Sequence, residues 1–296
     1  MKKLLLIVNP CAGKKKANPH LTNIISVFNH ADYEVTVHVT AQSGEATTVA
    51  AERGSAFDLL VCIGGDGTFN EVITGADRLD PISRPVLGYI PAGSTNDFAN
   101  SLHLDKDPVE AARNIVKGKV QTLDIGKFNG RCFSYIASFG AFTHASYATP
   151  QNLKNLLGHT AYLLESVKEL TSIRSHHVRF TTEDGRVYED DYIFGAISNS
   201  TSVAGVLTLD PQIVDMNDGL LELLLVRKPH SLLELSNCIK ALGTHDYDSP
   251  MLTLLSTPSV KIEAPEDMDW TLDGEFQEGS TNCSVVNCHS AINIIL

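Results

Sequence analysis

The sequence predicts an α/β domain with a doubly wound, mostly parallel sheet, followed by a β-rich antiparallel sandwich with helical insertions. Early in the chain, continuous apolar runs alternate with helix-like segments. Further on, shorter alternating runs are separated by Asn-Gly and Asp-Gly turn signals. A length of 296 residues suits one large domain or two ordinary ones. We expect domains over residues 1–123 and 124–296, with the extreme C-terminus able to pack back on the first.

The first domain is predicted from three buried-type strands and one alternating strand. Leu4–Val8, Leu59–Ile63 and Val86–Ile90 are continuous apolar runs, as in strands that are covered on both faces. Tyr33–Val39 alternates between apolar and polar residues. Helix-like stretches follow the strands, over His20–His30, Ser43–Arg53, Thr68–Ala76 and Asp107–Lys117, with another after Asn96.

The second domain is predicted from runs bounded by turn signals at Asn129-Gly130, Asp184-Gly185, Asp218-Gly219 and Asp273-Gly274. Helices are expected over Gln151–Arg174 and Ser231–Leu242. The leucines of the first helix either face a core or help to line an apolar groove. The expected strands include Val178–Thr182, Asp191–Ser198, Leu220–Val226, Val260–Glu263 and Ala291–Ile295.

Composition excludes several classes of function. The 23 Lys and Arg against 35 Asp and Glu give a net charge of −12, which argues against nucleic acid as the main partner. No apolar run approaches the roughly 18 residues of a membrane-spanning helix. The opening MKKLLLIVNP is too short for a signal peptide, so a cytoplasmic location is expected. The six cysteines contain no CxxC pair, which favours free, mostly buried thiols over a zinc site.

The strongest local motif is IGGDGTFNE at Ile63–Glu71, between a buried strand and a helix. Its glycines let the backbone approach a ligand closely, and the helix N-terminus suits a phosphate. A tight structural turn would use the same residues. Gly-bearing loops also follow the first strand, at Val8–Lys14, and the third buried strand, at Pro91–Phe98. Three such loops at one sheet edge favour a phosphate-binding site.

These blocks are recognisable together. NPxAGK near the start, GGDGT and PxGSTNDFA resemble the bacterial diacylglycerol kinase-like family of lipid kinases, with sphingosine and ceramide kinases as more distant relatives. The resemblance continues through Leu209–Val226, which is similar to the metal-site hairpin of that family, and Leu272–Gly279, which is similar to its catalytic DGE segment. GGDGT alone is shared with NAD kinases and phosphofructokinases, but the five blocks together are specific.

The resemblance implies an ATP site with Mg²⁺ between the phosphates and Asp66, a residue that would otherwise be an ordinary turn aspartate. Ser94 stands where the family more often has Thr, and the hydroxyl is kept. The positions that the resemblance assigns to the nucleotide are Asn9, Gly13, Lys14, Thr40, Gly65, Asp66, Gly67, Thr68, Phe69, Asn70, Glu71 and Ser94.

Two further sites are implied in the second domain. Asp215, Asp218 and the Leu220 carbonyl are similar to the family's structural magnesium site, although Asn-Asp-Gly is also an ordinary hairpin turn. Glu275 matches the general base that takes the proton of the lipid hydroxyl, with a solvated strand residue as the alternative.

The implied activity is ATP- and Mg²⁺-dependent transfer of the γ-phosphate to a lipid hydroxyl, of diacylglycerol or a related glycerolipid. Glu275 would face the nucleotide across an interdomain cleft, with hinge closure during turnover. The enzyme would be cytoplasmic and peripherally bound to the membrane surface during turnover, and exposed alternating strands would allow a homodimer. The alternatives are a soluble-substrate kinase of the NAD kinase type and a catalytically silent nucleotide- or lipid-binding protein.

Overall fold

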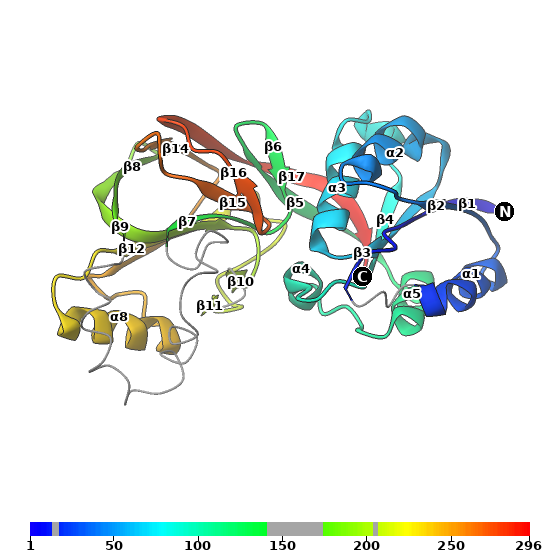
Figure 1. Ribbon diagram of the computed structural model, residues 1–296, viewed down its shortest axis with the longest axis horizontal. Coiled ribbons are helices and arrows are strands. Elements are labelled where there is room, and N and C mark those ends of the chain that lie inside the picture. Colours follow the sequence, from blue (N-terminus) through cyan, green and yellow to red (C-terminus); the bar gives the residue numbers. More distant parts are fainter. Residues whose placement is uncertain (14–17, 141–173, 204–206) are drawn as a thin grey trace. The chain divides into compact units, whose positions relative to one another are not determined.

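The computed structural model describes residues 1–13, 18–140, 174–203 and 207–296 (Figure 1). The chain forms two compact units. Unit 1 contains residues 1–125 and 288–296, and unit 2 contains residues 126–287. Two strands, β5 (Val120–Phe128) and β17 (Asn282–Ile295), run from one unit into the other. A parallel α/β part followed by an antiparallel β-rich part confirms the predicted fold class.

Unit 1 is built on a parallel sheet with the strand order β17-β4-β3-β1-β2. β17 joins this sheet near its end, where Ile294 is in register with Leu87 of β4. The elements of unit 1, apart from β5 and β17, are β1 (Lys2–Val8), α1 (Leu21–His30), β2 (Tyr33–Val39), α2 (Glu45–Arg53), β3 (Leu59–Gly64), α3 (Asp66–Asp77), β4 (Val86–Pro91), α4 (Asp97–Ser101) and α5 (Pro108–Lys117), with 3-10 turns at Asn18–His20, Gly54–Ala56 and Pro81–Ser83.

Helices cover both faces of this sheet. α1 and α5 pack together on one face, and α2 and α3 pack together on the other (Figure 1). Leu4 and Leu6 of β1 belong to the core that contains Ile24 of α1 and Ile115 of α5. Leu5 is also fully buried, and because alternate side chains of a strand point to opposite faces, it faces the other helix layer. Burial on both sides explains why this strand is a continuous apolar run.

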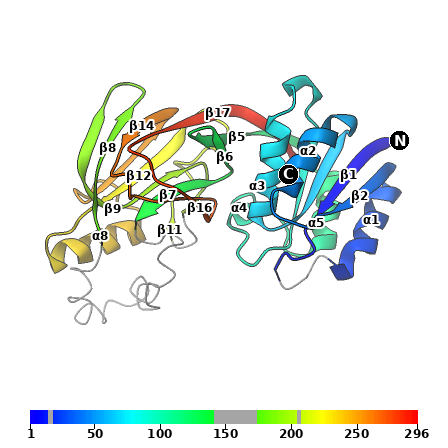
Figure 2. The same cartoon turned by 45° about the horizontal axis from the view of Figure 1, so that its top comes forward.

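Unit 2 is an antiparallel, β-rich structure in which β8, β9 and β14 lie side by side (Figure 2). The long strand β9 also pairs with β7 and β12, which lets the sheet divide around one hydrophobic core. The elements of unit 2 are β6 (Arg131–Phe133), β7 (Ile136–Gly140), β8 (His176–Thr182), β9 (Val187–Ser198), β10 (Ser202–Val203), β11 (Leu207–Thr208), β12 (Leu221–Arg227), α8 (Leu232–Thr244), β13 (Leu252–Thr257), β14 (Ser259–Glu263), β15 (Trp270–Leu272) and β16 (Glu275–Gln277).

Of the two helices expected in the second half of the chain, one is present and the other falls outside the described residues. The helix expected over Ser231–Leu242 is α8, and the side chain of Ser231 caps it by accepting a hydrogen bond from the Glu234 amide. The helix expected over Gln151–Arg174 lies outside the described residues, apart from Arg174 itself. None of the helices described here has the length and apolar character needed to cross a bilayer.

Candidate functional site

The carboxyl ends of β1, β3 and β4 lie at one edge of the parallel sheet. Val8 at the end of β1 is in register with Ile63 of β3, and Gly64 at the end of β3 is in register with Pro91 at the end of β4. Backbone hydrogen bonds continue this pairing into the loops. The Asn9 amide donates to the Ile63 carbonyl at 2.9 Å, and the Ala92 amide donates to the Gly64 carbonyl at 2.7 Å. The three Gly-bearing loops therefore start side by side and form one corner of unit 1, which we call the glycine corner (residues 9–13, 64–68 and 91–96).

Glycines allow these loops to approach one another backbone to backbone. A Cβ atom added at Gly93 would lie 2.7 Å from the Cα of Gly65. At Gly13, where φ is +53°, it would lie 2.4 Å from the Ala92 carbonyl oxygen. Neither position has room for a larger residue, and the positive φ at Gly13 also favours glycine. The corner is thus built from closely apposed main chain rather than from interlocking side chains.

The N-terminus of α3 opens at this corner. Its N-cap residue, Gly65, has an extended backbone and provides no side-chain hydrogen bond to the first amides of the helix. Such amides, together with the helix dipole, form a ready binding site for an anion. Asp66 is the acidic residue in the first turn. Amides beside a carboxylate can hold a phosphate together with a divalent cation, because the cation separates the two negative groups.

Tyr89 orients the Asp66 carboxylate. The Tyr89 hydroxyl donates a hydrogen bond to Asp66 Oδ1 at 3.1 Å. The tyrosine is 1% exposed, and its ring stacks on Phe69 with 4.4 Å between centroids and an interplanar angle of 4°. Tyr89 was not among the expected site residues. A polar aromatic residue inside the apolar run Val86–Ile90 is the signal that could have identified it.

Two residues of the IGGDGTFNE motif have side-chain roles other than nucleotide contact. Phe69 is fully buried in the core of unit 1. The Glu71 carboxylate accepts hydrogen bonds from Ser43 Oγ at 3.3 Å and from the amides of Gly44 and Ala46 at 2.9 and 3.2 Å, so it caps the start of α2. At these two positions the structure supports core packing and helix capping for the side chains, which leaves the backbone for any ligand.

Other expected nucleotide residues do meet at the glycine corner. Asn9 Nδ2 donates to Thr68 Oγ1 at 2.8 Å, which links the loop after β1 to the start of α3. Thr40 lies beside the end of β1, where its amide donates to the Val8 carbonyl at 2.9 Å. Gly67 and Asn70 belong to the first two turns of α3, Ser94 is exposed in the loop after β4, and Lys14 lies outside the described residues.

Asn96 belongs to the loop expected at this site, although it was not among the individual residues assigned to the nucleotide. Its φ of +55° places it in the left-handed region, directly before α4. The side chain folds back so that Nδ2 donates to the Gly93 carbonyl at 3.1 Å. Its Oδ1 atom is buried and accepts no hydrogen bond from any described residue. This unused acceptor is consistent with a donor supplied by a ligand.

In unit 2, the DGE segment forms a two-residue hairpin between β15 and β16. Asp273 and Gly274 have φ values of +51° and +82°, and Leu272 pairs with Glu275 across the turn. This confirms the turn predicted from Asp-Gly. The nearly buried Asp273 carboxylate accepts hydrogen bonds from the amides of three consecutive residues, at 2.6, 3.0 and 3.0 Å, namely Ser134, Tyr135 and Ile136.

Glu275 is exposed at the start of β16 and forms an ion pair. Arg131 Nη2 lies 2.7 Å from Glu275 Oε2, and the two side chains are 41% and 54% exposed. An accessible carboxylate at a defined position can act as a general base toward a substrate that reaches it. Arg131 was not expected at this site, since 144 residues separate it from Glu275.

The expected metal site forms a turn before β12. Asp215 Oδ1 accepts a hydrogen bond from the Asn217 amide, and Asp218 Oδ1 accepts one from the Leu220 amide. The Leu220 carbonyl accepts a hydrogen bond from Asn287 Nδ2 at 2.9 Å. Among the described residues, no group of three or more His, Cys, Asp or Glu side chains is gathered into a complete metal cage. Two carboxylates and a carbonyl are nevertheless the hard oxygen donors that Mg²⁺ prefers.

The carboxyl group of a third acidic residue, Glu222, is affected by the negative charges of Asp215 and Asp218 in this turn. Glu222 on β12 is fully buried, and its Oε2 atom has no hydrogen-bond partner among the described residues. Burial, together with the negative charges of Asp218 and Asp215, raises the pKa of Glu222 to about 8. A divalent cation would offset this concentration of negative charge, so the residues present fit such an ion.

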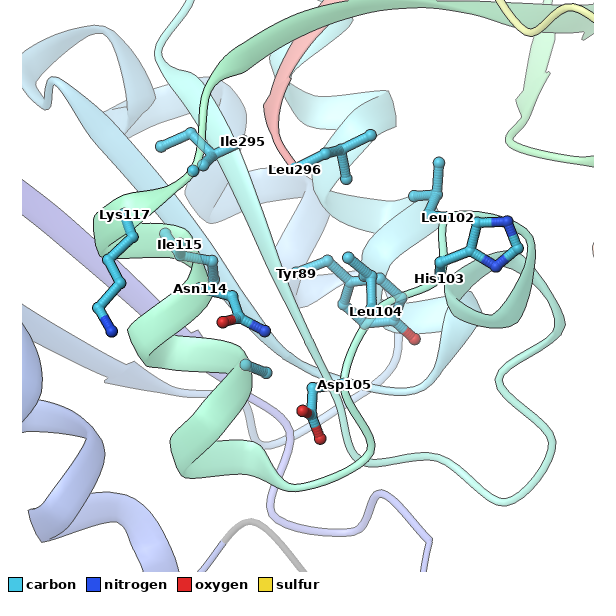
Figure 3. A pocket seen from close by; sticks show the side chains of 12 residues that line it. Tyr89, Leu102, His103, Leu104, Asp105, Asn114, Ile115, Lys117, Ile295 and Leu296 are labelled. Carbon is cyan, nitrogen blue, oxygen red and sulfur yellow. The ribbon is translucent and has the colours of Figure 1, made fainter.

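A cavity of about 280 Å³ lies elsewhere in unit 1 (Figure 3). No described residue of the expected nucleotide set lines it, so it is separate from the glycine corner. Tyr89 connects the two features, since its ring forms part of the wall and its hydroxyl binds Asp66. The apolar part of the wall consists of Leu102, Leu104, Ile115, Ile295 and Leu296.

Models of known protein families match the sequences of both units. A family model described as the diacylglycerol kinase catalytic domain matches residues 3–128, and one described as the YegS C-terminal NAD kinase beta sandwich-like domain matches residues 137–295. A diacylglycerol kinase of Bacillus subtilis is 33% identical over 100% of this chain and 97% of its own length. One from Staphylococcus epidermidis is 32% identical over 99% of this chain and 92% of its own length.

Solved structures show the same relationship. A crystal structure of a diacylglycerol kinase from Bacillus anthracis superposes with a TM-score of 0.75 at 26% identity, covering 99% of this chain and 96% of the other. Fold and relatives together define a kinase with the fold of lipid kinases. The chain belongs to the diacylglycerol kinase family, which confirms the resemblance carried by its five motifs.

Proposed function

We propose that the protein is an ATP- and Mg²⁺-dependent lipid kinase that transfers the γ-phosphate to a hydroxyl of diacylglycerol or a related glycerolipid. The observation that carries this proposal is the glycine corner, where three loops and the N-terminus of α3 meet beside Asp66. Amides for phosphate and a carboxylate for a cation are the two requirements of a site for a metal–nucleotide complex. The curated relatives that are named diacylglycerol kinases support a lipid as the acceptor.

In the proposed mechanism, the backbone of Gly65 and Gly93 and the first amides of α3 bind the phosphates. Asp66, oriented by Tyr89, would hold Mg²⁺ together with the nucleotide. When bound, Mg²⁺ supplies positive charge that neutralises the phosphoryl oxygens. Asp215, Asp218 and the Leu220 carbonyl would hold a second Mg²⁺ with a structural role.

Glu275 is the proposed general base. Its carboxylate accepts the proton of the lipid hydroxyl as the hydroxyl oxygen attacks the γ-phosphate in line, which requires a separation of about 3 Å in the reacting complex. Glu275 and Asp66 belong to different units. The proposal therefore requires the two units to bring both groups to one substrate during turnover. We propose a cytoplasmic enzyme that binds the membrane surface while it works, with a homodimer as its assembly.

The acceptor can be identified directly. The purified protein is incubated with radiolabelled ATP and either a mixed lipid extract, dispersed diacylglycerol or NAD, and the labelled product is identified by mass. Label on a glycerolipid is expected. Label on NAD alone, or on none of these acceptors, would contradict the lipid kinase proposal.

The roles of the two acids are tested by conservative substitutions. Glu275→Gln should lower kcat about 10²–10⁴-fold, the range of general-base catalysis, while Asp66→Asn should also impair ATP binding. Glu278→Gln provides the control, because Glu278 is an exposed acid three residues from Glu275. Phosphate transfer that survives both Glu275→Gln and Asp66→Asn would show that these roles are wrong.

A further inference from the structure

The backbone around Glu275 does little to fix the conformation of its side chain. β16 has three residues, lies at the end of the sheet order and pairs with β15. Glu275 and Phe276 are both largely exposed. An exposed glutamate on a short edge strand can sample several rotamers, so its carboxylate would seldom occupy the position that proton transfer requires.

One guanidinium group compensates for this freedom. Arg131 of β6 donates from Nη2 to Glu275 Oε2 at 2.7 Å. Its Nη1 donates to the Phe276 carbonyl at 3.1 Å and to Gln277 Oε1 at 3.1 Å. Glu275 and Gln277 are two residues apart on a strand, so their side chains lie on the same face. Arg131 thus holds both side chains and the carbonyl between them, which the planar, multidentate guanidinium can do in one conformation.

The same segment of unit 2 anchors the hairpin on the other side of Glu275. The amides of residues 134–136 bind the Asp273 carboxylate, two residues before Glu275. Arg131, three residues before this group of amides, binds the side chain of Gln277, two residues after Glu275. Residues 131–136 therefore fix the hairpin before and after Glu275 and also bind its carboxylate.

The contacts of Arg131 are poorly placed to stabilise the fold. Exposed ion pairs contribute little to the free energy of unfolding, because water screens them and two long side chains must be ordered. The Arg131 hydrogen bond uses Oε2 of Glu275, and no described residue donates a hydrogen bond to Oε1. The pairing thus orients the carboxylate and leaves one of its oxygens open to a substrate hydroxyl.

We propose that Arg131 is a positioning residue for Glu275, which acts by fixing the orientation of the base and not by contacting the substrate itself. This inference rests on the proposed function, in which Glu275 accepts the proton.

The test compares Arg131→Met and Arg131→Lys with Arg179→Met. Arg179 is the matched control, since it is an arginine of unit 2 that is 45% exposed and lies within 4 Å of two carboxylates, those of Glu189 and Glu263. Arg131→Met is expected to lower kcat about 10–100-fold, the scale of a misplaced catalytic group, with the KM for ATP changed less than about twofold. Arg131→Lys should recover part of kcat, and Arg179→Met should behave as the wild type. Thermal unfolding should be unchanged in all three.

A double variant separates the positioning role from its alternatives. If Arg131 acts through Glu275, adding Arg131→Met to Glu275→Gln should lower kcat no further. An additional loss of tenfold or more would mean that Arg131 contacts the substrate independently, and would overturn the inference. Wild-type kcat in Arg131→Met would also overturn it, as would a loss of kcat that follows a fall in thermal stability and is not relieved by lysine. Full activity in Glu275→Gln would instead refute the proposed function.

Discussion

The dipeptide Asp-Gly occurs in both of the proposed catalytic segments, but it begins a helix in one and forms a hairpin turn in the other. In unit 1, Asp66-Gly67 begins α3, and the Asp66 carboxylate lies beside the helix N-terminus, where Tyr89 orients it. In unit 2, Asp273-Gly274 forms a hairpin turn, and the Asp273 carboxylate is taken up by three backbone amides. In unit 2 the proposed general base is therefore Glu275, the residue that follows Gly274.

The two segments also differ in what holds them. Close backbone approach fixes the glycine corner, where Gly13 and Gly93 leave no room for a Cβ. Charged side chains fix the hairpin, through Asp273 and Arg131. We therefore expect substitutions that add side-chain volume to disturb the glycine corner. We expect substitutions that remove a charged side chain to disturb the hairpin.

The largest effect on stability is expected from Asp273→Ala. It leaves three amides without their charged acceptor, and three hydrogen bonds to a charged group at about 1.5–3 kcal/mol each sum to roughly 4.5–9 kcal/mol. Water that enters the space left by the carboxylate replaces part of this sum, so we expect a loss of about 3–5 kcal/mol from the free energy of unfolding. Urea denaturation measures this loss. Asp273→Asn, which keeps one oxygen acceptor, should lose less, and Asp184→Ala, at an exposed Asp-Gly turn, should lose least. Equal losses at the two turns would show that the amides contribute little.

Gly93→Ala should have the next largest effect, together with the largest effect on nucleotide binding. The added methyl group meets the Cα of Gly65, and overpacking of this kind costs about 1–3 kcal/mol. Because relief of the clash separates two of the three loops, the affinity for ATP should fall at least about tenfold, as calorimetry can measure. Gly243→Ala, where the added atom meets nothing within 4 Å, is the control. Unchanged ATP affinity in Gly93→Ala would remove the loop contact from the proposed nucleotide site.

Glu222→Gln should stabilise the protein in a pH-dependent way. The folded carboxyl group has a pKa of about 8 against an ordinary value of 4.5, so between these values the folded state keeps a proton that the unfolded state loses. Stability conferred by the wild-type residue therefore falls as the pH rises through this window. At about 1.4 kcal/mol per pKa unit the upper limit is about 5 kcal/mol, and relaxation should reduce the gain to about 1–3 kcal/mol at pH 8.

Thermal unfolding from pH 4.5 to 8 with a metal chelator present tests this prediction, since a bound cation would favour the ionised carboxylate. The difference between Glu222→Gln and the wild type should be small at pH 4.5 and should grow with pH. A difference that is independent of pH would mean that Glu222 is already ionised in the folded protein.

The smallest effect is expected from Asn9→Ala. It removes the hydrogen bond from Nδ2 to Thr68 and the acceptor of the Cys11 amide, which should cost about 1 kcal/mol of stability. The KM for ATP should rise severalfold, because the loop after β1 loses its side-chain link to α3. Steady-state kinetics measures this rise, and Asn282→Ala, at an exposed position of unit 2, is the control. An unchanged KM would separate this link from nucleotide binding.

Sequence patterns predicted unit 1 well because its signals are local. Burial on both faces makes β1 and β3 continuous apolar runs, and each is followed by a loop that contains glycine. The strands of the second half of the chain were predicted less completely. β15 and β16 have three residues each, too few for a period to show, and the strand expected over Ala291–Ile295 is the end of the much longer β17.

The side-chain partners at the candidate sites could not be predicted in the same way. Glu222 interrupts an apolar run and carries no local sign that it is buried. Arg131 and Glu275 meet only because β6 and β16 come together in unit 2. The motif GGDGTFNE shows where these residues lie in the fold but not which way each side chain points. The sequence therefore did not show that Phe69 faces the core or that Glu71 caps α2.

The return of residues 288–296 to unit 1 has a consequence for biosynthesis. The ribosome makes this segment after all of unit 2, on the order of 10 s later than residue 125 at ordinary elongation rates. Until then, β4 lacks the neighbour that Ile294 of β17 provides at Leu87. The nascent chain thus carries an incomplete first sheet through most of its translation, and unit 1 reaches its final form only after unit 2 has been synthesised.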